Sequence, residues 1–414
     1  MTIKKSFSLQ TQLKRLKHIQ ASILPFMLIA VLLVAVTLQA QPAKGASKFL
    51  GNICGNSVRN DFLTYWNQVS PENCAKWGSV EGTQGKFNFS GIDNMKTFAE
   101  TNKIPWKLHT LIWGAQQPSW ITSLSQADQL AAITKWFDTL SKRYPNVDLI
   151  DVVNEGYPTH APPRYKEALG GDGATGYDWI IKAFQLARQK WPKAILIYND
   201  YNKIEWNNEV NWTPTMVNAI KKAGAPIDAI GCQAHDAYRI AANSLKSNMD
   251  KLAATGLPLY VTEFDIPDAN DATQKTTMQD KFTVFWNHPK CIGVTYWGYI
   301  VGQTWKNGTG LLSSTGIERP ALTWLKDYVK SNLNPPNDFL NSAITIESPS
   351  APTPRAAMVR NDLSLVRIFD LQGRITGSLY VNSRVIPVWP MKLSQGCYAV
   401  KREGSYAGTI TKLR

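Results

Sequence analysis

Several common signatures of chemistry are absent from this 414-residue sequence. Its five cysteines lack Cys-x-x-Cys spacing and its five histidines are scattered, so we expect no zinc cluster and no metal site. No Gly-x-Gly-x-x-Gly or Gly-x-x-x-x-Gly-Lys-Ser/Thr motif follows a strand-like run, which removes the usual nucleotide-binding loops. The sequence therefore predicts a protein without a cofactor.

The body of the chain also lacks an excess of charge, although the whole sequence carries a formal +14. Residues 1–47 carry +6 and residues 355–414 carry +7, whereas the residues between them hold 29 basic and 28 acidic groups. A groove for nucleic acid would need a basic surface. The neutral body therefore predicts that nucleic acid is not a partner.

The N-terminus has the pattern of a secretory signal peptide over residues 1–40. Five basic residues precede the almost entirely apolar run Ile23–Val36, and Leu38-Gln39-Ala40 offers a small-residue cleavage site. The alternative is a membrane anchor, because the uncharged stretch Ala21–Ala43 approaches the length of a spanning helix. Pro25 and the nearby glutamines favour cleavage. We expect a protein that is secreted or associated with the cell surface.

An exported protein can form disulfides. Cys54 and Cys74 are the first pair to test, because a bridge between them would join two early strands. The pattern among the five cysteines, which also include Cys232, Cys291 and Cys397, stays open.

Residues 48–333 alternate short apolar runs with amphipathic stretches. Ser125 begins one such helix, with apolar residues at helical spacing up to Tyr144, and Pro145 ends it. Further helices are expected at Tyr177–Trp191, Thr215–Ala223, Ser244–Ala254 and Thr273–Trp286. Strands are expected at Phe49–Cys54, Val69–Trp77, Trp106–Ile112, Val147–Asn154, Ala194–Asn199, Ile227–Gln233, Pro258–Phe264 and Ile292–Trp297. Eight such units predict an α/β protein with a (β/α)8 TIM barrel rather than an open doubly wound sheet.

The sequence changes character after the predicted barrel. Residues 334–356 are rich in proline and read as an extended linker. Residues 357–414 form short strand-like runs, at Leu363–Asp370, Val385–Pro387 and Cys397–Lys401, separated by turn signals. We expect a small, basic, all-β module without catalytic groups.

The predicted strands carry polar residues at their carboxyl ends, where the active site of a (β/α)8 barrel lies. A single such residue is more often structural, but seven strand ends with polar or aromatic groups are harder to explain as scaffold. Glu155 ends the fourth strand and Glu263 ends the seventh, in an otherwise apolar run. Two facing carboxylates suit cleavage of a glycosidic bond. His235 on the neighbouring strand could hydrogen-bond Glu263 and keep it ionised, although both glutamates could instead brace the barrel mouth.

The combined motifs resemble the family 10 glycoside hydrolases, the endo-β-1,4-xylanases. They are ENxxKW at 72–77, HTLIW at 109–113, DVVNE at 151–155, YNDYN at 198–202, QAH at 233–235 and VTEFDI at 261–266. The resemblance implies a retaining mechanism on xylan, with Glu155 as acid/base, Glu263 as nucleophile, and Asn154 and His235 as supporting residues. It also implies that the glycone subsites are lined by Glu72, Asn73, Lys76, His109, Trp113, Gln233, Trp297 and Trp305.

Each of these assignments has a plain alternative: the tryptophans could be core residues and Lys76 a surface ion pair. His160 and His288 have no supporting context and are read as surface or structural residues. The chain departs from the family where Gly114 replaces a frequent second histidine and where Cys74 lies inside the Glu-Asn motif. Its compact catalytic region suggests trimmed loops, which bears on chain-length preference rather than on the reaction.

We expect a monomer whose partners are xylan and xylo-oligosaccharides. The alternatives are a related barrel acting on another β-glucan or on a xyloside, and a catalytically silent polysaccharide-binding protein. For the C-terminal module, which resembles small basic modules of secreted polysaccharide-degrading enzymes, three partners stay open: the cell surface, the secretion machinery and an acidic polysaccharide. A solvated appendage is the fourth possibility.

Overall fold

The computed structural model describes residues 41–336 in full and, further along, the backbone of strands at 364–369, 375–381, 396–402 and 405–412. The predicted signal peptide and nearly all of the predicted linker lie outside these residues. The barrel strands are β1 (Phe49–Cys54), β2 (Gln68–Pro71), β3 (Lys107–Ile112), β4 (Leu149–Asn154), β5 (Ile195–Asp200), β6 (Ala229–Cys232), β7 (Leu259–Phe264) and β8 (Cys291–Tyr296). The α-helices are α2 (Phe62–Tyr65), α3 (Trp77–Val80), α4 (Ser90–Asn102), α5 (Gln126–Arg143), α6 (Asp178–Lys190), α7 (Asn207–Lys222), α8 (Ala242–Ala253), α9 (Asp271–Asn287) and α10 (Pro320–Ser331).

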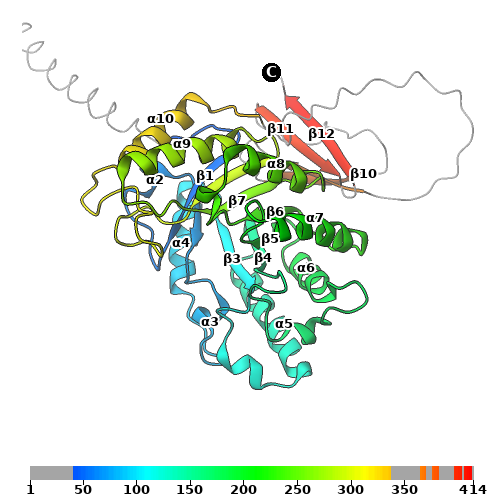
Figure 1. The fold of residues 1–414 in the computed structure, drawn as a ribbon. Coiled ribbons are helices and arrows are strands. Elements are labelled where there is room, and N and C mark those ends of the chain that lie inside the picture. The colour runs from blue at the N-terminus through cyan, green and yellow to red at the C-terminus, as the bar shows by residue number, and fades with distance from the viewer. Residues whose placement is uncertain (1–40, 337–363, 370–374, 382–395, 403–404, 413–414) are drawn as a thin grey trace, which may run out of the picture.

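The eight strands form one parallel sheet that closes on itself. The hydrogen-bonded order is β2-β1-β8-β7-β6-β5-β4-β3. The two end strands meet through a parallel bridge between Val69 and Trp106, where the Val69 amide donates to the Pro105 carbonyl at 3.1 Å. Helices surround the sheet on its outer side (Figure 1). This arrangement confirms the predicted (β/α)8 barrel.

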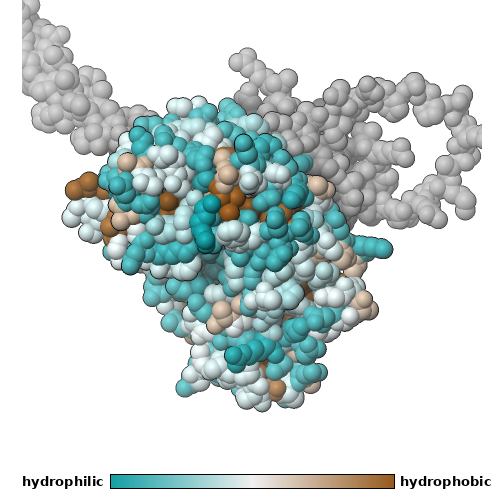
Figure 2. Space-filling view, viewed as in Figure 1, coloured by the Kyte–Doolittle hydropathy of each residue, from teal (hydrophilic) through white to brown (hydrophobic). Residues whose placement is uncertain are grey.

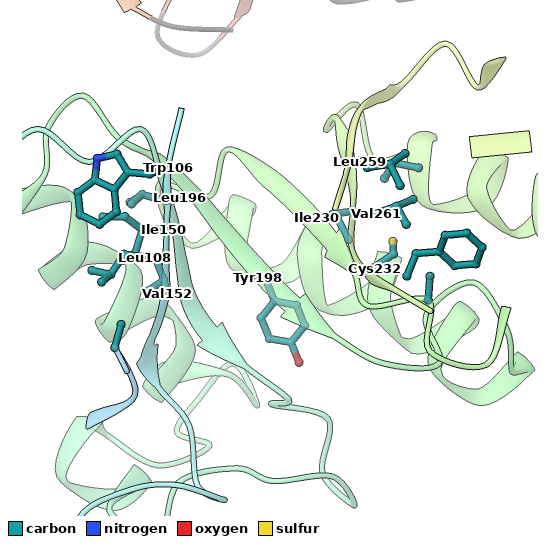
Figure 3. Close-up of a cluster of buried hydrophobic side chains, with 14 of the residues drawn as sticks. Trp106, Leu108, Ile150, Val152, Leu196, Tyr198, Ile230, Cys232, Leu259 and Val261 are labelled. Atoms are coloured by element: carbon teal, nitrogen blue, oxygen red, sulfur yellow. The ribbon is translucent and has the colours of Figure 1, made fainter. Parts of the chain in front are cut away.

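Alternation along the strands divides the buried side chains into two layers. One set of apolar side chains packs between the sheet and the helices (Figure 3). It includes Leu108, Ile150, Leu196, Ile230 and Val261. A smaller cluster joins side chains from β1 and from the four neighbouring strands β4 to β7: Phe49, Leu149, Ile197, Ala229 and Tyr260. Phe49 of β1 stacks on Tyr260 of β7 with ring centroids 5.4 Å apart, which is possible only across the barrel interior. The barrel interior near the amino ends of the strands is therefore filled by apolar side chains. The polar groups lie at the carboxyl ends.

Helix α5 shows how local sequence signals set the elements. The Ser125 hydroxyl accepts a hydrogen bond from the Asp128 amide at 3.2 Å, which caps the first turn as predicted. Ile133, Phe137 and Leu140 form its buried side. The opposite sides of such helices face solvent, and the face drawn in Figure 2 is mostly hydrophilic, with hydrophobic residues in small groups. In the described part of the chain, helices long and apolar enough to span a bilayer are not found.

Two element boundaries differ from the sequence prediction. Strand β2 ends at Pro71 instead of continuing to Trp77, because the chain turns there and Trp77 begins the short helix α3. Helix α7 begins at Asn207, eight residues before the predicted start, and contains Pro214. Proline at 214 removes the helical donor of the Val210 carbonyl, and the helix nevertheless continues to Lys222.

The strands beyond residue 363 form an antiparallel sheet of their own. They are β9 (Ser364–Phe369), β10 (Ile375–Val381), β11 (Gly396–Arg402) and β12 (Ser405–Lys412), in the order β10-β9-β11-β12. Two of the three predicted runs coincide with β9 and β11, whereas β10 and β12 were not predicted. The predicted run Val385–Pro387 lies outside the described residues.

The structure does not contain the disulfide considered between Cys54 and Cys74. Both are free thiols, as are Cys232 and Cys291. Cys54, Cys232 and Cys291 are buried, and burial raises the pKa of each of these thiols, so they behave as small apolar core residues. Cys74 is partly exposed and lies in the turn after β2.

Candidate active site

Backbone hydrogen bonds continue past the carboxyl ends of four neighbouring strands and hold their polar residues side by side. The amide of Glu155 donates to the Asn199 carbonyl at 2.9 Å, and the amide of Gln233 donates to the Asp200 carbonyl at 3.0 Å. The amide of Glu263 in turn donates to the Gln233 carbonyl at 3.1 Å. The residues predicted on strands 4, 6 and 7 are therefore brought together at one end of the barrel.

Glu263 is a buried carboxylate held in its charged form. Its Oε2 lies 3.2 Å from His235 Nε2, and Asn199 Nδ2 donates to its Oε1 at 2.7 Å. Burial alone would raise the pKa of Glu263, but the hydrogen bond from His235 and the positive charges nearby outweigh burial and lower it. The expected contact between His235 and Glu263 is present.

His235 is oriented by a second carboxylate. Its Nδ1 lies 3.0 Å from Asp265 Oδ2, so one imidazole bridges two acidic groups. Burial would lower the pKa of His235, but the hydrogen bonds to Asp265 and Glu263 raise it. The histidine therefore stays protonated beside Glu263, which explains why this carboxyl stays ionised.

Glu155 has the opposite electrostatic setting. Burial and the negative charge of Glu263 raise its pKa, although two side chains donate to it. Trp113 Nε1 donates to Oε2 at 2.8 Å and Gln233 Nε2 donates to Oε1 at 3.1 Å. Two carboxyls of one site thus have pKa values displaced in opposite directions, which is how a site assigns one as acid and the other as anion.

A set of amide side chains connects the two carboxyls. Asn199 Nδ2 contacts Glu263 and also donates to Asn154 Oδ1 at 2.8 Å. Gln233 Nε2 lies 3.2 Å from the same Asn154 oxygen and contacts Glu155. Asn154 and Gln233 are almost fully buried, with exposed fractions of 1% and 2%. The network fixes the position of each carboxyl relative to the other.

Left-handed backbone occurs at two places in this network. Glu155 has a φ of +55° and Ala234, between Gln233 and His235, has a φ of +63°. Such conformations cost a non-glycine residue about 1–3 kcal/mol and are found where a site constrains the chain. At these two positions, immediately after the ends of β4 and β6, the left-handed backbone determines where the side chains of Glu155 and His235 point.

The residues after β2 form one side of the site. Lys76 Nζ donates to Asn73 Oδ1 at 2.9 Å and lies 4.7 Å from the centroid of the Trp113 ring. Burial lowers the pKa of Lys76, against the influence of the charges of Glu263, Glu72 and Glu155. A buried ammonium among three carboxyls excludes the reading of Lys76 as a surface ion pair. Asn73 is exposed and Glu72 half-buried, so both are accessible to a ligand.

His109, Trp297 and Trp305 complete this side. The rings of His109 and Trp297 meet edge to face at 5.5 Å, and His109 Nδ1 lies 2.8 Å from Asp151 Oδ2. Trp297 is nearly buried, whereas Trp305 is 54% exposed and donates through Nε1 to Asp265 Oδ2 at 2.7 Å. An indole so exposed is not a core residue, and it presents an aromatic face at the mouth.

Several residues of the site received no role from the sequence. Asn199 and Asp265 stood on predicted strand ends, but only the structure shows that they contact Glu263 and His235. His160 is buried beside the site: its Nδ1 lies 2.6 Å from Asp200 Oδ1 and its ring stacks on Tyr201 at 3.6 Å. A strand-end position signalled the first two, whereas nothing in the sequence signalled His160. His288 is structural, with Nε2 3.1 Å from Asp250 Oδ1.

Gly114 is explained by close packing. Its amide donates to the Ala161 carbonyl at 2.9 Å, and a Cβ there would lie 2.4 Å from the Pro162 carbonyl oxygen. The loop after Glu155 therefore occupies the space that a side chain at position 114 would need.

Within the described residues, no group of three or more His, Cys, Asp or Glu side chains is arranged to hold a metal ion. The mouth contains one carboxyl with a raised pKa and one with a lowered pKa, amides, a buried lysine and the exposed ring of Trp305. A (β/α)8 barrel with this pair of carboxyls has the site of a glycoside hydrolase.

Comparison with known proteins gives the family. The chain matches the model of Glycosyl hydrolase family 10 over residues 38–328, and it belongs to that family. It is 45% identical over 282 residues to endo-1,4-beta-xylanase B of Cellvibrio japonicus (strain Ueda107), and 30% identical over 254 residues to endo-1,4-beta-xylanase B of Thermotoga neapolitana. These matches cover 68% and 59% of this chain, and 45% and 72% of the relatives. The chain thus spans less than half the length of the Cellvibrio protein.

Solved structures agree with the fold. Native xylanase 10B from Thermotoga maritima superposes with a TM-score of 0.63 at 26% identity, over 70% of this chain and 98% of that one. The Thermotoga petrophila xylanase 10B in complex with xylobiose gives the same TM-score and identity, over 70% and 97% of the two chains.

Proposed function

We propose that this protein is a retaining endo-1,4-β-xylanase that cleaves internal bonds of xylan by double displacement. The observation that carries the proposal is the pair of carboxyls, Glu263 buried and Glu155 half-buried, whose pKa values are displaced in opposite directions and which one amide network connects. Membership of glycosyl hydrolase family 10 and the xylanases among its relatives support the choice of substrate.

In the first step, protonated Glu155 gives its proton to the leaving glycosidic oxygen while Glu263 attacks the anomeric carbon. The carbon–oxygen bond to the leaving group breaks, and a bond from the carbon to the Glu263 carboxylate forms. In the second step, Glu155 takes a proton from water, the water oxygen bonds to the anomeric carbon, and Glu263 leaves as a carboxylate. Two inversions restore the original configuration.

The remaining site residues bind and orient the sugar. Asn154 accepts hydrogen bonds from Asn199 and Gln233, the two amides that contact the carboxyls, which supports its role in binding the hydroxyl next to the reacting carbon. Glu72, Asn73, Lys76, His109, Trp113, Gln233, Trp297 and Trp305 line the side that holds the sugar attacked by Glu263. His235 keeps that nucleophile ionised.

The test replaces each carboxyl in turn. Glu263→Ala removes the atom that bonds to the sugar, so we expect activity on xylan to fall by about 10⁴-fold or more. Glu155→Gln keeps the shape but cannot give a proton, so activity on xylan falls strongly. An aryl β-xylobioside with an acidic phenol loses less in its first step, because its leaving group needs little protonation. Reducing-sugar release and phenol release measure the two. Near-wild-type xylan cleavage by Glu263→Ala would refute the assignment.

A second candidate, a polysaccharide-binding protein without activity, would bind xylan and release no reducing sugar. The complete carboxyl pair favours the enzyme. Product sizing on xylan, mannan and cellulose separates xylan from other β-glucans.

We further propose that the protein is exported and acts as a monomer. The support is the N-terminal pattern of residues 1–40, with its basic region, apolar run and cleavage site. The basic module at 357–414 would attach the enzyme to the cell surface or to an acidic polysaccharide, or take part in secretion. Mass spectrometry of the exported protein tests cleavage after Ala40, and sedimentation tests the monomer.

A further inference from the structure

His160 lies in the loop that directly follows Glu155, the acid of the proposed reaction. The amide of Ala161 donates to the Glu155 carbonyl at 3.0 Å, so this loop closes on the residue from which it starts. The Ala161 carbonyl in turn accepts from the Gly114 amide at 2.9 Å, next to Trp113. Trp113 is the residue whose indole donates to Glu155 Oε2. The loop is therefore fastened both to the backbone of Glu155 and to the segment that holds its carboxyl.

The imidazole of His160 joins this loop to the loop after β5 and to helix α7. Its Nδ1 lies 2.6 Å from Asp200 Oδ1, and its Nε2 lies 3.4 Å from Glu209 Oε1. Its ring stacks on that of Tyr201, with the centroids 3.6 Å apart and the planes 13° from parallel. The side chain is only 4% exposed. A ring so enclosed cannot contact a sugar, so any part it takes in the reaction is indirect.

Asp200, at the end of β5, is the common partner of His160 and of the loop backbone. Its Oδ2 accepts hydrogen bonds from the Tyr157 amide and from the Tyr198 hydroxyl, both at 3.0 Å. Its Oδ1 accepts from the Tyr201 amide at 3.0 Å and faces His160 Nδ1. A buried carboxylate is stable only when donors surround its oxygens. His160 supplies one of these four donors, so its loss would loosen the contact between Asp200 and the loop.

Glu155 depends on this loop more directly than the second carboxyl does. Its backbone has a φ of +55°, a conformation that persists only where surrounding contacts hold it. The charge of Asp200 also adds to the rise in the pKa of Glu155, after the larger effects of burial and of Glu263. Glu263 is held by other contacts, from His235 and Asn199. A displaced loop would thus move the acid and leave the nucleophile in place.

We propose that His160 is a positioning residue for proton transfer: it fixes the loop after Glu155 and so keeps this carboxyl directed at the glycosidic oxygen. The buried imidazole contacts neither the substrate nor the reacting atoms, and it acts through the backbone of its loop. It serves both proton transfers, from Glu155 to the leaving oxygen and from water to Glu155, but not the attack by Glu263. The inference rests on the proposed function, which gives Glu155 these two steps.

Leaving groups of different acidity distinguish this role from a general effect on folding. A phenol of high pKa needs a proton as it leaves, whereas dinitrophenol leaves as a stable anion. For His160→Ala we expect kcat/KM to fall about thirtyfold on xylohexaose and on phenyl β-xylobioside, and to stay within about twofold of the wild type on dinitrophenyl β-xylobioside. His160→Asn keeps an N–H near the position of Nδ1 and should recover part of the loss.

Azide tests the second proton transfer. This anion attacks the glycosyl-enzyme without needing a base, so it should raise kcat of His160→Ala on dinitrophenyl β-xylobioside and yield β-xylobiosyl azide. In that step an azide nitrogen bonds to the anomeric carbon while Glu263 leaves as a carboxylate. The wild type, in which Glu155 activates water, should gain little from azide.

His288→Ala is the matched control, because His288 is also a buried histidine beside a carboxylate, Asp250, but caps the end of α9. It should leave the ratio of kcat/KM on the two aryl substrates at the wild-type value. For His160→Ala, an unchanged ratio would overturn the proposal, whether all rates fall together or none falls. If thermal unfolding shows that this variant does not fold, the same ratio decides for His160→Gln, whose amide cannot reproduce the contact of Nδ1 with Asp200. A Glu155→Gln variant whose loss does not depend on the leaving group would instead refute the proposed function.

Discussion

His235 is the residue on which the charge of the site depends. It contacts Glu263 and Asp265 with its two ring nitrogens, and these contacts keep it protonated. The imidazolium in turn keeps Glu263 ionised, whereas burial raises the pKa of Glu155. In the proposed first step Glu263 is charged and Glu155 is neutral, so we expect activity to fall at low pH as Glu263 is protonated and at high pH as Glu155 loses its proton.

His235→Ala should therefore shift one limb of the pH profile. Without the donor and its charge, burial dominates and the pKa of Glu263 rises, so the acid limb of kcat/KM moves up by about one to two pH units. The alkaline limb belongs to Glu155 and should stay in place. Initial rates on an aryl β-xylobioside across pH measure both limbs. His288→Gln serves as the control, because His288 contacts Asp250 and no site residue. An acid limb that does not move would contradict this electrostatic role.

The candidate site residues that could be predicted from the sequence are those at the end of a predicted strand. Glu155, Gln233 and Glu263 could be found because each ends an apolar strand run. His160 could not, because its partner Tyr201 comes from a loop more than 30 residues away. Contacts between loops depend on the turns of the barrel, which leave no periodic pattern in the sequence.

At the scale of elements, the site depends on how closely β5 and β6 approach. Gly231 of β6 pairs with Asn199 of β5, and a Cβ at Gly231 would lie 2.5 Å from Asn199 Oδ1. Asn199 is the amide that contacts both Asn154 and Glu263, and its Oδ1 also accepts from Thr262 at 2.6 Å. A glycine at 231 thus leaves room for the network above it.

Gly231→Ala should disturb this network. The added methyl group displaces the Asn199 side chain, so we expect activity on xylan to fall about a hundredfold through misplacement of Glu263. Overpacking of this kind also lowers the free energy of unfolding by about 1–3 kcal/mol. Rates on xylan and thermal unfolding measure the two effects. Gly55→Ala is the control, since a Cβ at Gly55 meets no atom within 4 Å. Wild-type rates for Gly231→Ala would show that Asn199 adapts.

Element types were predictable and some boundaries were not. Buried parallel strands have unbroken apolar runs, so all eight could be located. Strand β2 was predicted too long because the run Val69–Trp77 contains apolar residues at both ends, yet after Pro71 the Glu72 amide bonds the Cys54 carbonyl and the chain turns. Helix α7 was predicted too short because proline normally interrupts a helix, whereas here the helix continues on both sides of Pro214.

At the scale of the whole molecule, charge and catalysis are carried by different parts of the chain. The site residues lie between 72 and 305, in a body that is close to neutral. Residues 41–414 carry +9, and residues 41–354 carry only +2. A neutral cleft suits an uncharged sugar polymer, whereas a strongly basic module attracts acidic surfaces over a distance that salt shortens.

Deleting residues 355–414 should therefore change attachment and leave chemistry alone. We expect kcat/KM on soluble xylo-oligosaccharides to remain within about twofold of the full chain, because the site contacts described above are made by residues before 336. Retention on insoluble glucuronate-bearing xylan should drop at low salt, and the difference between the two proteins should vanish at high salt because the charges are then screened. Pull-down at both salt concentrations and the distribution between cells and medium are the measurements. Loss of cell association with unchanged pull-down would show that the module acts in sorting or surface attachment. No change in either assay would show that it has no role in attachment.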